Sequence, residues 1–314
     1  MSKRLRFTLL GHPVAHSISP AIYTAAFKAL RLSYLYGVVD IPTPAELRLA
    51  LDDLRGGIVA GSNVTLPYKR AVMDMADTRA DSAEEVGAAN VLAVDRKKRV
   101  VAHNTDADAL AAELAELLGG RPKFRAVVVG AGGAGLAALV ACKRIGFKVV
   151  CVTTRSWANS EEMFDSPAAD RARSLGALTS LWPKGNEPDR PTTKASQVLR
   201  LQWRELAVQA DLILQATSAG MTGGDPGEEV CGIVPWDRLA PDTLVYDVVY
   251  TPRVTPFLQK AKAHGCRAVG GLGMLVRQAQ LAVRLWTGEE PPIDALRAAA
   301  EDALTAAEAK REAK

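Results

Sequence analysis

The sequence has few of the residues that build disulfide frameworks or metal sites. It contains four cysteines and four histidines in 314 residues, and no two cysteines have the close spacing of a zinc site or a redox pair. This pattern excludes a small disulfide-stapled fold, and we expect no bound metal. Widely spaced cysteines without a pairing pattern are typical of a reducing compartment, so we expect a cytoplasmic protein.

Long apolar runs and a large excess of one charge are also missing. The most apolar stretch, residues 126–142, is interrupted by four glycines, unlike a membrane span. Residues 1–6 carry three basic side chains without the apolar core of a signal peptide. The 39 basic and 35 acidic residues leave a net charge of +4 with no basic run. We therefore expect no nucleic-acid partner and no membrane partner.

What is present is an ordinary globular composition, with 48% hydrophobic and 24% charged residues. At 314 residues the chain exceeds the size at which a single core usually stops growing. We therefore expect two domains, with chemistry in a central cleft.

The N-terminal third alternates strand-like and helical patterns. Residues 7–10, 34–39 and 57–64 are rich in β-branched and aromatic side chains, whereas residues 20–30, 44–54 and 68–75 have helical periodicity. This alternation predicts an α/β domain with a mostly parallel sheet.

A second α/β series begins after a predicted helix at residues 107–118. Its predicted strands cover residues 124–129, 148–153, 212–216, 244–248 and 267–269. We expect a Rossmann-like, NADP-binding domain at residues 107–274 and a substrate-binding and catalytic domain formed by residues 1–106 with 275–314. The last helix should pack on the first domain. Residues 157–201 have weak periodicity and are predicted to be an elaborated loop that could contain one helix.

A glycine-rich loop connects the first strand of this series to a helix. The loop has the pattern G-x-G-x-x-G, and its residues are Gly130, Ala131, Gly132, Gly133, Ala134 and Gly135. Between a buried strand and a helix, this pattern lets the backbone approach a pyrophosphate at the helix N-terminus. The loop therefore predicts a bound dinucleotide.

The residues at the end of the second strand indicate which dinucleotide binds. NAD enzymes usually place an acid there, whereas this chain has Thr154, Arg155 and Ser156. Arg155 could pair with a 2′-phosphate, which favours NADP (NADPH) over NAD. The alternative is a solvated surface arginine, and NAD remains an alternative cofactor.

Three polar segments follow predicted strands of the first domain. They are residues 11–20, residues 63–69, and Asn90 together with residues 104–106. The carboxyl ends of strands in α/β sheets are where ligands bind, so these segments can converge on one site. Ser19 and Asp106 could each instead be simple helix N-caps.

Helix capping does not explain Lys69. Pro67 predicts a helix start, and a lysine in the first turn faces the positive end of the helix dipole. That position favours the neutral amine, which could exchange a proton with a substrate hydroxyl. A neighbouring Asp106 would orient the amine, and the pair could support hydride chemistry without a metal.

Seven motifs in order give the chain a clear resemblance to the shikimate dehydrogenase family. They occupy residues 11–20, 63–69, 104–106, 130–135, 216–221, 247–255 and 271–278. The resemblance implies a reversible reduction of 3-dehydroshikimate to shikimate with NADPH, in the chorismate pathway of aromatic amino-acid biosynthesis. It also implies that Lys69 and Asp106 are the catalytic pair.

The resemblance further implies binding roles. Ser17 and Ser19 would hold the substrate carboxylate. The ring hydroxyls would be bound by the side chains of Thr65, Asn90 and Gln278, with Asn63 and Tyr250 close by. The nicotinamide would be bordered by Thr217, Val248, Gly271 and Met274.

Several positions depart from the family pattern. Tyr23 and Thr24 replace the usual His-Asn pair, Ala107 and Ala109 replace glycines, and Asn159 stands near the place of a second basic residue. These departures leave open a quinate or dual quinate/shikimate dehydrogenase that uses NAD. A separate alternative is a non-catalytic dinucleotide-binding regulator, against which the presence of both Lys69 and Asp106 counts. The sequence leaves the choice between a monomer and a homodimer open.

Overall fold

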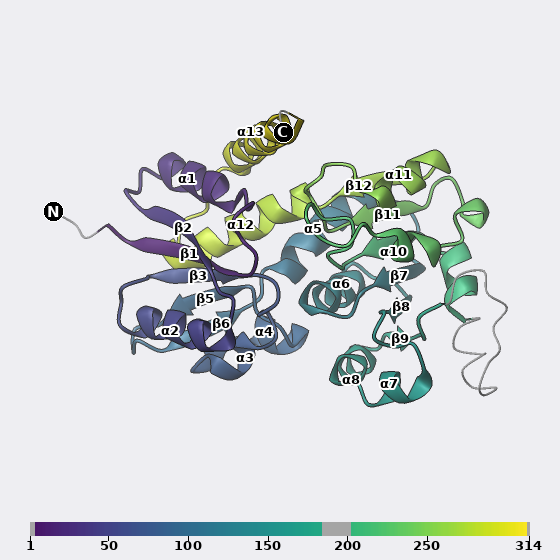
Figure 1. Cartoon of the computed structure of the whole chain (residues 1–314), viewed down its shortest axis with the longest axis horizontal. Coiled ribbons are helices and arrows are strands. Elements are labelled where there is room, and N and C mark those ends of the chain that lie inside the picture. Colours follow the sequence, from purple (N-terminus) through teal and green to yellow (C-terminus); the bar gives the residue numbers. More distant parts are fainter. Residues whose placement is uncertain (1–3, 184–201, 313–314) are drawn as a thin grey trace. The chain divides into compact units, whose positions relative to one another are not determined.

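The structure is a computed structural model that describes residues 4–183 and 202–312. The chain divides into two compact units, Met1–Ala109 with Gly273–Lys314, and Leu110–Leu272. Each unit contains one six-stranded sheet with helices around it (Figure 1). The divisions fall near the start of α5 (Asp106–Leu118) and of α12 (Leu272–Thr287). The predicted α/β class is confirmed.

The sheet of the first unit has the strand order β2-β1-β3-β5-β6-β4. Its strands are β1 (Arg6–Gly11), β2 (Leu35–Asp40), β3 (Gly61–Val64), β4 (Thr78–Arg79), β5 (Val91–Val94) and β6 (Val100–His103). The first three strands pair in parallel, as predicted, but β5 is antiparallel to both neighbours. The sequence prediction missed the β5–β6 hairpin and placed the start of β3 four residues too early.

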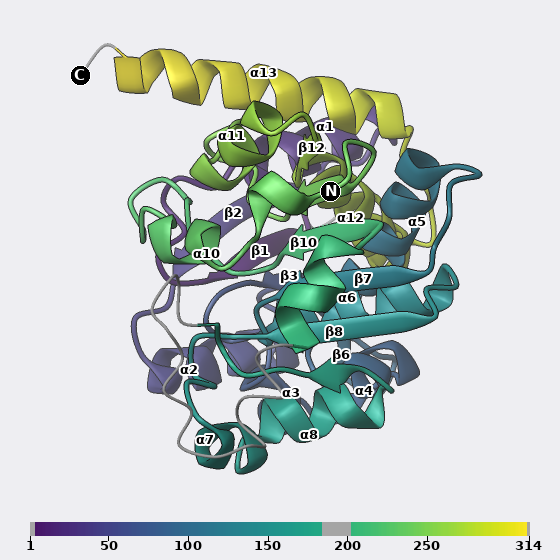
Figure 2. The ribbon, with the colours of Figure 1, turned by 90° about the vertical axis from the view of Figure 1, so that its right-hand side faces the viewer.

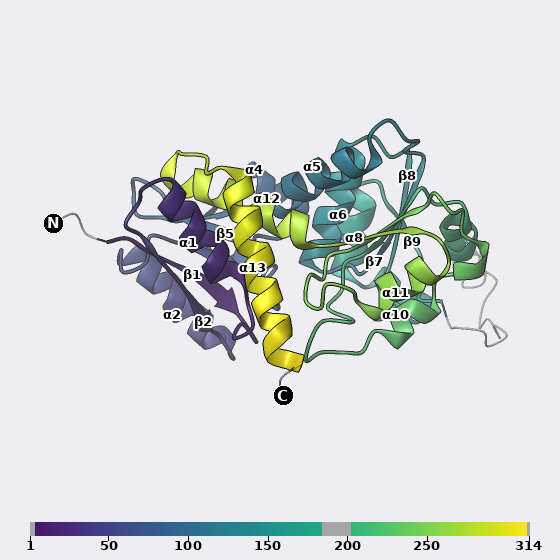
Figure 3. The ribbon, with the colours of Figure 1, turned by 90° about the horizontal axis from the view of Figure 1, so that it is seen from above.

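Side-chain alternation along β1 gives this sheet two buried faces. On one face, Phe7 contacts Phe27 of α1 (Ser19–Ala29) and Trp286 of α12. On the other, Leu10 packs in a cluster with Leu47 and Leu51 of α2 (Pro44–Arg55). The last helix, α13 (Ile293–Glu312), packs along α1, as the sequence predicts (Figure 3). Two short helices, α3 (Val72–Met75) and α4 (Asp81–Val86), complete the unit.

The sheet of the second unit is entirely parallel, with the order β12-β11-β10-β7-β8-β9 (Figure 2). Its strands are β7 (Arg125–Val129), β8 (Val149–Thr153), β9 (Leu178–Thr179), β10 (Leu212–Gln215), β11 (Leu244–Asp247) and β12 (Arg267–Gly270). Counted along the chain, this is the 3-2-1-4-5-6 order of the Rossmann fold. The predicted dinucleotide-binding architecture is confirmed.

Helix α6 (Gly133–Arg144) connects β7 to β8. The opposite face is covered by residues 203–207, α10 (Glu228–Gly232) and α11 (Pro256–Ala263), whose apolar side chains share one core cluster. The predicted loop at residues 157–201 contains α7 (Ser160–Phe164), α8 (Pro167–Ser174) and β9, and its residues 184–201 lie outside the described residues. All four cysteines are free and buried. Among the described residues, no helix is long and apolar enough to span a bilayer.

Candidate active site

The ends of β1 and β3 are held together by backbone hydrogen bonds. Thr65 N–H donates to the Leu10 carbonyl and His12 N–H to the Leu66 carbonyl, each at 2.9 Å. Gly11 must be small here, because a Cβ would lie 2.3 Å from the Thr65 methyl carbon. The segment that carries Ser17 and Ser19 therefore starts beside the segment that carries Thr65 and Lys69.

Lys69 and Asp106 form a close, largely buried ion pair. Lys69 Nζ lies 2.5 Å from Asp106 Oδ2, and their side chains are 17% and 4% exposed. The other carboxylate oxygen, Oδ1, accepts a hydrogen bond from Asn90 Nδ2 at 2.8 Å. Asp106 is therefore fixed on both oxygens, and it holds the amine in one place.

The predicted helical environment of Lys69 is wrong. Residues 66–71 form turns, and α3 begins only at Val72. The reason is that the Lys69 carbonyl accepts a hydrogen bond from Ala89 N–H at 2.7 Å, while Met73 N–H bonds to Arg70 instead. Lys69 thus lies outside any helix, and Asp106, not a helix dipole, determines its surroundings.

Asn90 is the centre of a buried polar network. Its Oδ1 accepts from Thr105 N–H at 2.7 Å, and its Nδ2 lies 2.9 Å from Thr105 Oγ1 and 3.3 Å from Gln278 Oε1. Thr105 Oγ1 also donates to the Gln278 carbonyl at 3.3 Å. This network connects the residue before β5, the residue before α5 and a residue of α12, which the sequence could only group by motif.

Asn63 has a partner that the sequence did not indicate. Tyr36 OH donates to Asn63 Oδ1 at 2.6 Å, and Asn63 Nδ2 lies 3.4 Å from the Asn90 carbonyl. Tyr23 stacks on Tyr36 with ring centroids 4.1 Å apart. Tyr36 occupies an ordinary strand position and belongs to no motif, so no sequence signal could have singled it out.

The Ser19 side chain does not cap the helix that follows it. Helix α1 begins at Ser19 itself, and its N-cap is Ile18, whose side chain makes no capping bond. Ser17 Oγ accepts from Ser19 N–H at 3.2 Å. The N-cap alternative for Ser19 is therefore wrong. For α5, Asn104 Oδ1 accepts from Ala107 N–H at 3.1 Å, so this capping bond is made by Asn104 and not by Asp106.

The glycine loop of the second unit fits a dinucleotide pyrophosphate. Gly130 has φ of +107°, and a Cβ on Gly135 would lie 2.0 Å from the Gly130 carbonyl oxygen. The chain itself thus requires the first and third glycines of the pattern. A Cβ on Gly132, in contrast, would meet no protein atom within 4 Å. The backbone there is open to a ligand at the N-terminus of α6, which no side chain caps.

The strand ends beside this loop carry the other predicted cofactor residues. A Cβ on Gly130 would lie 2.7 Å from the Thr217 methyl carbon, and one on Gly271 would lie 2.1 Å from the Val248 carbonyl oxygen. Tyr250 follows β11 in the same unit. Met274 is buried in α12 and belongs to the first unit.

A buried carboxyl group explains the spacing of the motif at residues 247–255. Asp247 Oδ1 accepts from Val249 N–H at 2.9 Å, and Oδ2 accepts from Thr255 Oγ1 at 2.6 Å. Burial raises the pKa of Asp247 to about 7, against the lowering effect of these two hydrogen bonds. Asp247 therefore closes the loop that carries Val248 and Tyr250.

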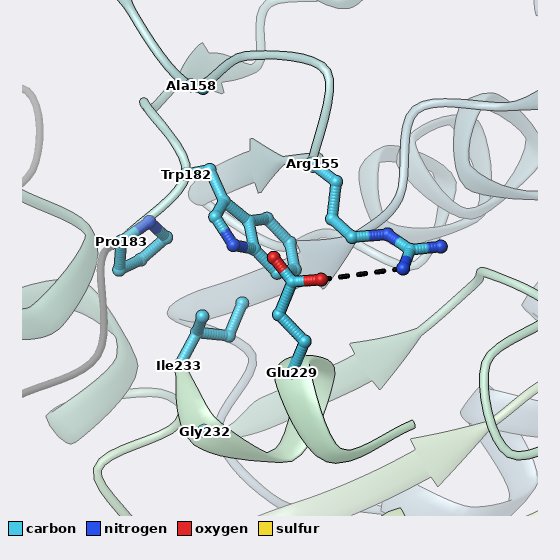
Figure 4. A pocket seen from close by; sticks show the side chains of 7 residues that line it. All are labelled: Arg155, Ala158, Trp182, Pro183, Glu229, Gly232 and Ile233. Atoms are coloured by element: carbon cyan, nitrogen blue, oxygen red, sulfur yellow. Dashed lines mark hydrogen bonds and ion pairs between the residues drawn. The ribbon is translucent and has the colours of Figure 1, made fainter. Parts of the chain in front are cut away.

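Arg155 lies where the sequence predicts, after β8, but it has partners that the sequence did not indicate. Its guanidinium forms an ion pair with Asp225. A second ion pair, at 3.4 Å, joins it to Glu229 (Figure 4). A cavity of about 350 Å³ borders it, lined also by Trp182 and Ile233.

Comparison with known proteins agrees with the resemblance seen in the sequence. The family model described as the shikimate dehydrogenase substrate binding domain matches residues 9–92, and the shikimate 5′-dehydrogenase C-terminal domain matches residues 271–301. A shikimate dehydrogenase (NADP(+)) of Symbiobacterium thermophilum is 37% identical, over 94% of this chain and 93% of the relative.

Solved structures show the same fold. The shikimate 5-dehydrogenase of Thermus thermophilus, in complex with NADP(H) and shikimate, has a TM-score of 0.74 and 32% identity, covering 96% of this chain and 100% of that one. The quinate dehydrogenase of Corynebacterium glutamicum, in complex with NAD, has a TM-score of 0.73 and 26% identity, covering 94% and 98%.

Proposed function

The chain belongs to the shikimate dehydrogenase family, and we propose that it reversibly reduces 3-dehydroshikimate to shikimate with NADPH in chorismate and aromatic amino-acid biosynthesis. The observation that carries this proposal is the Lys69–Asp106 pair, 2.5 Å apart and largely buried, beside the polar network of Asn90. Such a pair can move a proton at a hydroxyl without a metal.

In this reaction Lys69 and Asp106 manage the proton. NADPH, when bound, supplies the hydride that is added to the carbonyl carbon. The Lys69 ammonium donates its proton to the carbonyl oxygen, which becomes the hydroxyl, and in the oxidative direction the neutral amine takes that proton back. Asp106 orients Lys69, and Asn90 holds Asp106 in position.

The substrate is proposed to bind to polar groups around this pair. Ser17 and Ser19 would hold the carboxylate, since the hydroxyl of Ser19 is not used as a helix cap. The ring hydroxyls would be bound by the side chains of Asn63, Thr65, Asn90, Tyr250 and Gln278. Because Tyr36 fixes Asn63 Oδ1, the amide group of Asn63 is left to donate.

For the cofactor, residues 130–135 would hold the pyrophosphate. Thr217, Val248, Gly271 and Met274 would border the nicotinamide, and residues 154–156 the adenosine ribose. The unit Leu110–Leu272 is thus the proposed cofactor domain, and the other unit the proposed substrate domain. We place the protein in the cytoplasm, as a monomer or homodimer with a small-molecule substrate.

Steady-state oxidation of shikimate and of quinate, each with NADP and with NAD, tests this function. The largest kcat/KM is expected for shikimate with NADP. A preference for quinate with NAD would instead assign the activity of the Corynebacterium glutamicum neighbour. No turnover with any of the four pairs would refute the enzymatic proposal and favour a dinucleotide-binding regulator.

The role of Lys69 is tested by Lys69→Ala. We expect kcat to fall by about 10²- to 10⁴-fold, the usual contribution of a positioned acid or base, with little change in KM. Lys28→Ala removes an exposed lysine from α1 and should change neither constant. A Lys69→Ala enzyme with the wild-type kcat would rule out proton transfer by Lys69.

A further inference from the structure

The place where a Rossmann unit distinguishes NADP from NAD contains two acids as well as a base. Arg155 follows β8, whose Thr153 carbonyl accepts from Gly130 N–H of the glycine loop at 2.7 Å. In Rossmann folds the group at this strand end contacts the ribose 2′ position. The Arg155 side chain is 46% exposed and therefore accessible to a ligand.

Both acids come from one segment, about 70 residues further along the chain. Asp225 Oδ2 accepts from Arg155 Nη1. Glu229 Oε2 lies 3.4 Å from the same nitrogen (Figure 4). Neither acid belongs to a motif that was connected with the cofactor.

Asp225 is held rigidly in this position. Its Oδ1 accepts from Gly227 N–H at 2.8 Å, and its carbonyl accepts from Gly220 N–H at 2.7 Å. The Gly227 hydrogen bond, together with Arg155, lowers the pKa of Asp225 below its usual value, so the carboxylate is charged at neutral pH. Gly227 has φ of +85°, which strongly favours glycine and fixes the turn.

The charges at this place oppose a 2′-phosphate. One guanidinium faces two carboxylates, whereas a phosphate monoester brings a charge of about −1.5 to −2 at neutral pH. To bind Arg155, the phosphate has to displace the carboxylates or lie against them. A ribose 2′-hydroxyl can instead donate to a carboxylate, as it does to the acid of NAD enzymes.

We infer that Asp225 and Glu229 are specificity-determining residues for the cofactor: they engage Arg155, weaken its contact with a 2′-phosphate and accept a ribose 2′-hydroxyl. This inference rests on the proposed function and adds that NAD is accepted beside NADP. The two acids, and not Arg155 alone, set the ratio between the cofactors.

The test uses two probes that differ only by the 2′-phosphate, 2′,5′-ADP and 5′-AMP, with Kd measured by calorimetry on the full chain. The double variant Asp225→Asn, Glu229→Gln should bind 2′,5′-ADP about tenfold more tightly, the size expected for removing exposed charge interactions. Its affinity for 5′-AMP should stay the same or fall. Asp237→Asn, an exposed acid of the 3₁₀-helix Trp236–Arg238, removes a single acidic charge away from Arg155 and should alter neither Kd.

A double-mutant cycle with Arg155→Gln gives a second measurement. In the wild-type background this change should alter the Kd of 2′,5′-ADP by less than about threefold, because the carboxylates already occupy Arg155. In the double-variant background it should remove the whole tenfold gain. Equal effects of Arg155→Gln in both backgrounds, or an unchanged 2′,5′-ADP affinity in the double variant, would overturn the inference.

The test is separable from the proposed function because it needs neither substrate nor turnover. A protein inactive on shikimate could still show the predicted change in nucleotide binding. Conversely, if the protein oxidises shikimate but substitution of both acids leaves its nucleotide affinities unchanged, only this inference is contradicted. If neither nucleotide binds to the wild-type chain, the inference is wrong as well.

Discussion

The buried carboxyl group of Asp247 should make the stability of the protein depend on pH in an unusual direction. Asp247 has no exposed surface, and burial raises its pKa from 3.8 to about 7. Because the folded pKa is the higher one, the folded chain binds more protons than the unfolded chain between these values. The stabilising effect is complete below the unfolded pKa and is lost as the pH rises through about 7.

The magnitude follows from this pKa. Each pH unit between the two pKa values changes the free energy of unfolding by about 1.4 kcal/mol. From about pH 5 to pH 8, ionisation of Asp247 should therefore lower that free energy by about 3 kcal/mol. Asp247→Asn removes this dependence while keeping an oxygen for Val249 N–H and Gln215 Nε2.

Urea unfolding followed by tryptophan fluorescence measures the effect. Trp182, Trp203 and Trp236 lie in the same core cluster as Val245 of β11, so their emission reports on the unit that contains Asp247. The difference in unfolding free energy between wild type and Asp247→Asn should shift by about 3 kcal/mol from pH 5 to pH 8, in favour of the variant at the higher pH.

Asp77→Asn is the matched control. Hydrogen bonds from Arg55 and from the Val100 N–H lower the pKa of Asp77, so this carboxylate is ionised in both states above about pH 5. Its variant should differ from wild type by a constant amount over the same range. If the Asp247→Asn difference is also constant, the assigned titration of Asp247 is refuted.

Two further predictions concern packing. Tyr68→Phe loses the 2.7 Å hydrogen bond from the buried Tyr68 hydroxyl to the Ile41 carbonyl and should lower the free energy of unfolding by about 1 kcal/mol. An unchanged free energy in urea unfolding would contradict this contribution. Gly135→Ala should lower the free energy of unfolding by about 1–3 kcal/mol, because the new methyl group would clash with the Gly130 carbonyl oxygen. Gly132→Ala should leave the free energy of unfolding unchanged but weaken the binding of NADP in calorimetry. Equal losses of stability in the two variants would contradict the different roles of these glycines.

The fold of the second unit could be predicted from the sequence because the signals for its elements lie close together along the chain. Buried strands, glycines at fixed spacing and helices follow one another along the chain, and each signal lies within one βαβ unit. The hairpin of β5 and β6 was missed because its turn does not use glycine or proline. Instead, Asp95 Oδ1 accepts from Lys97 N–H and Arg99 N–H at 2.8 and 2.9 Å, and Lys98 adopts φ of +61°.

The environment of Lys69 could not be predicted in the same way, because distant backbone groups determine it. The sequence identified Lys69 and Asp106 as a pair, but placed Lys69 in a helix that the Ala89 N–H prevents from starting there. In the same way, the partners of Arg155 lie 70 and 74 residues further along the chain. Motifs therefore predict which side chains carry the chemistry, whereas the charge around each of them depends on long-range contacts. Cofactor preference is a property of this second kind, which is why Arg155 by itself is a weak predictor of NADP.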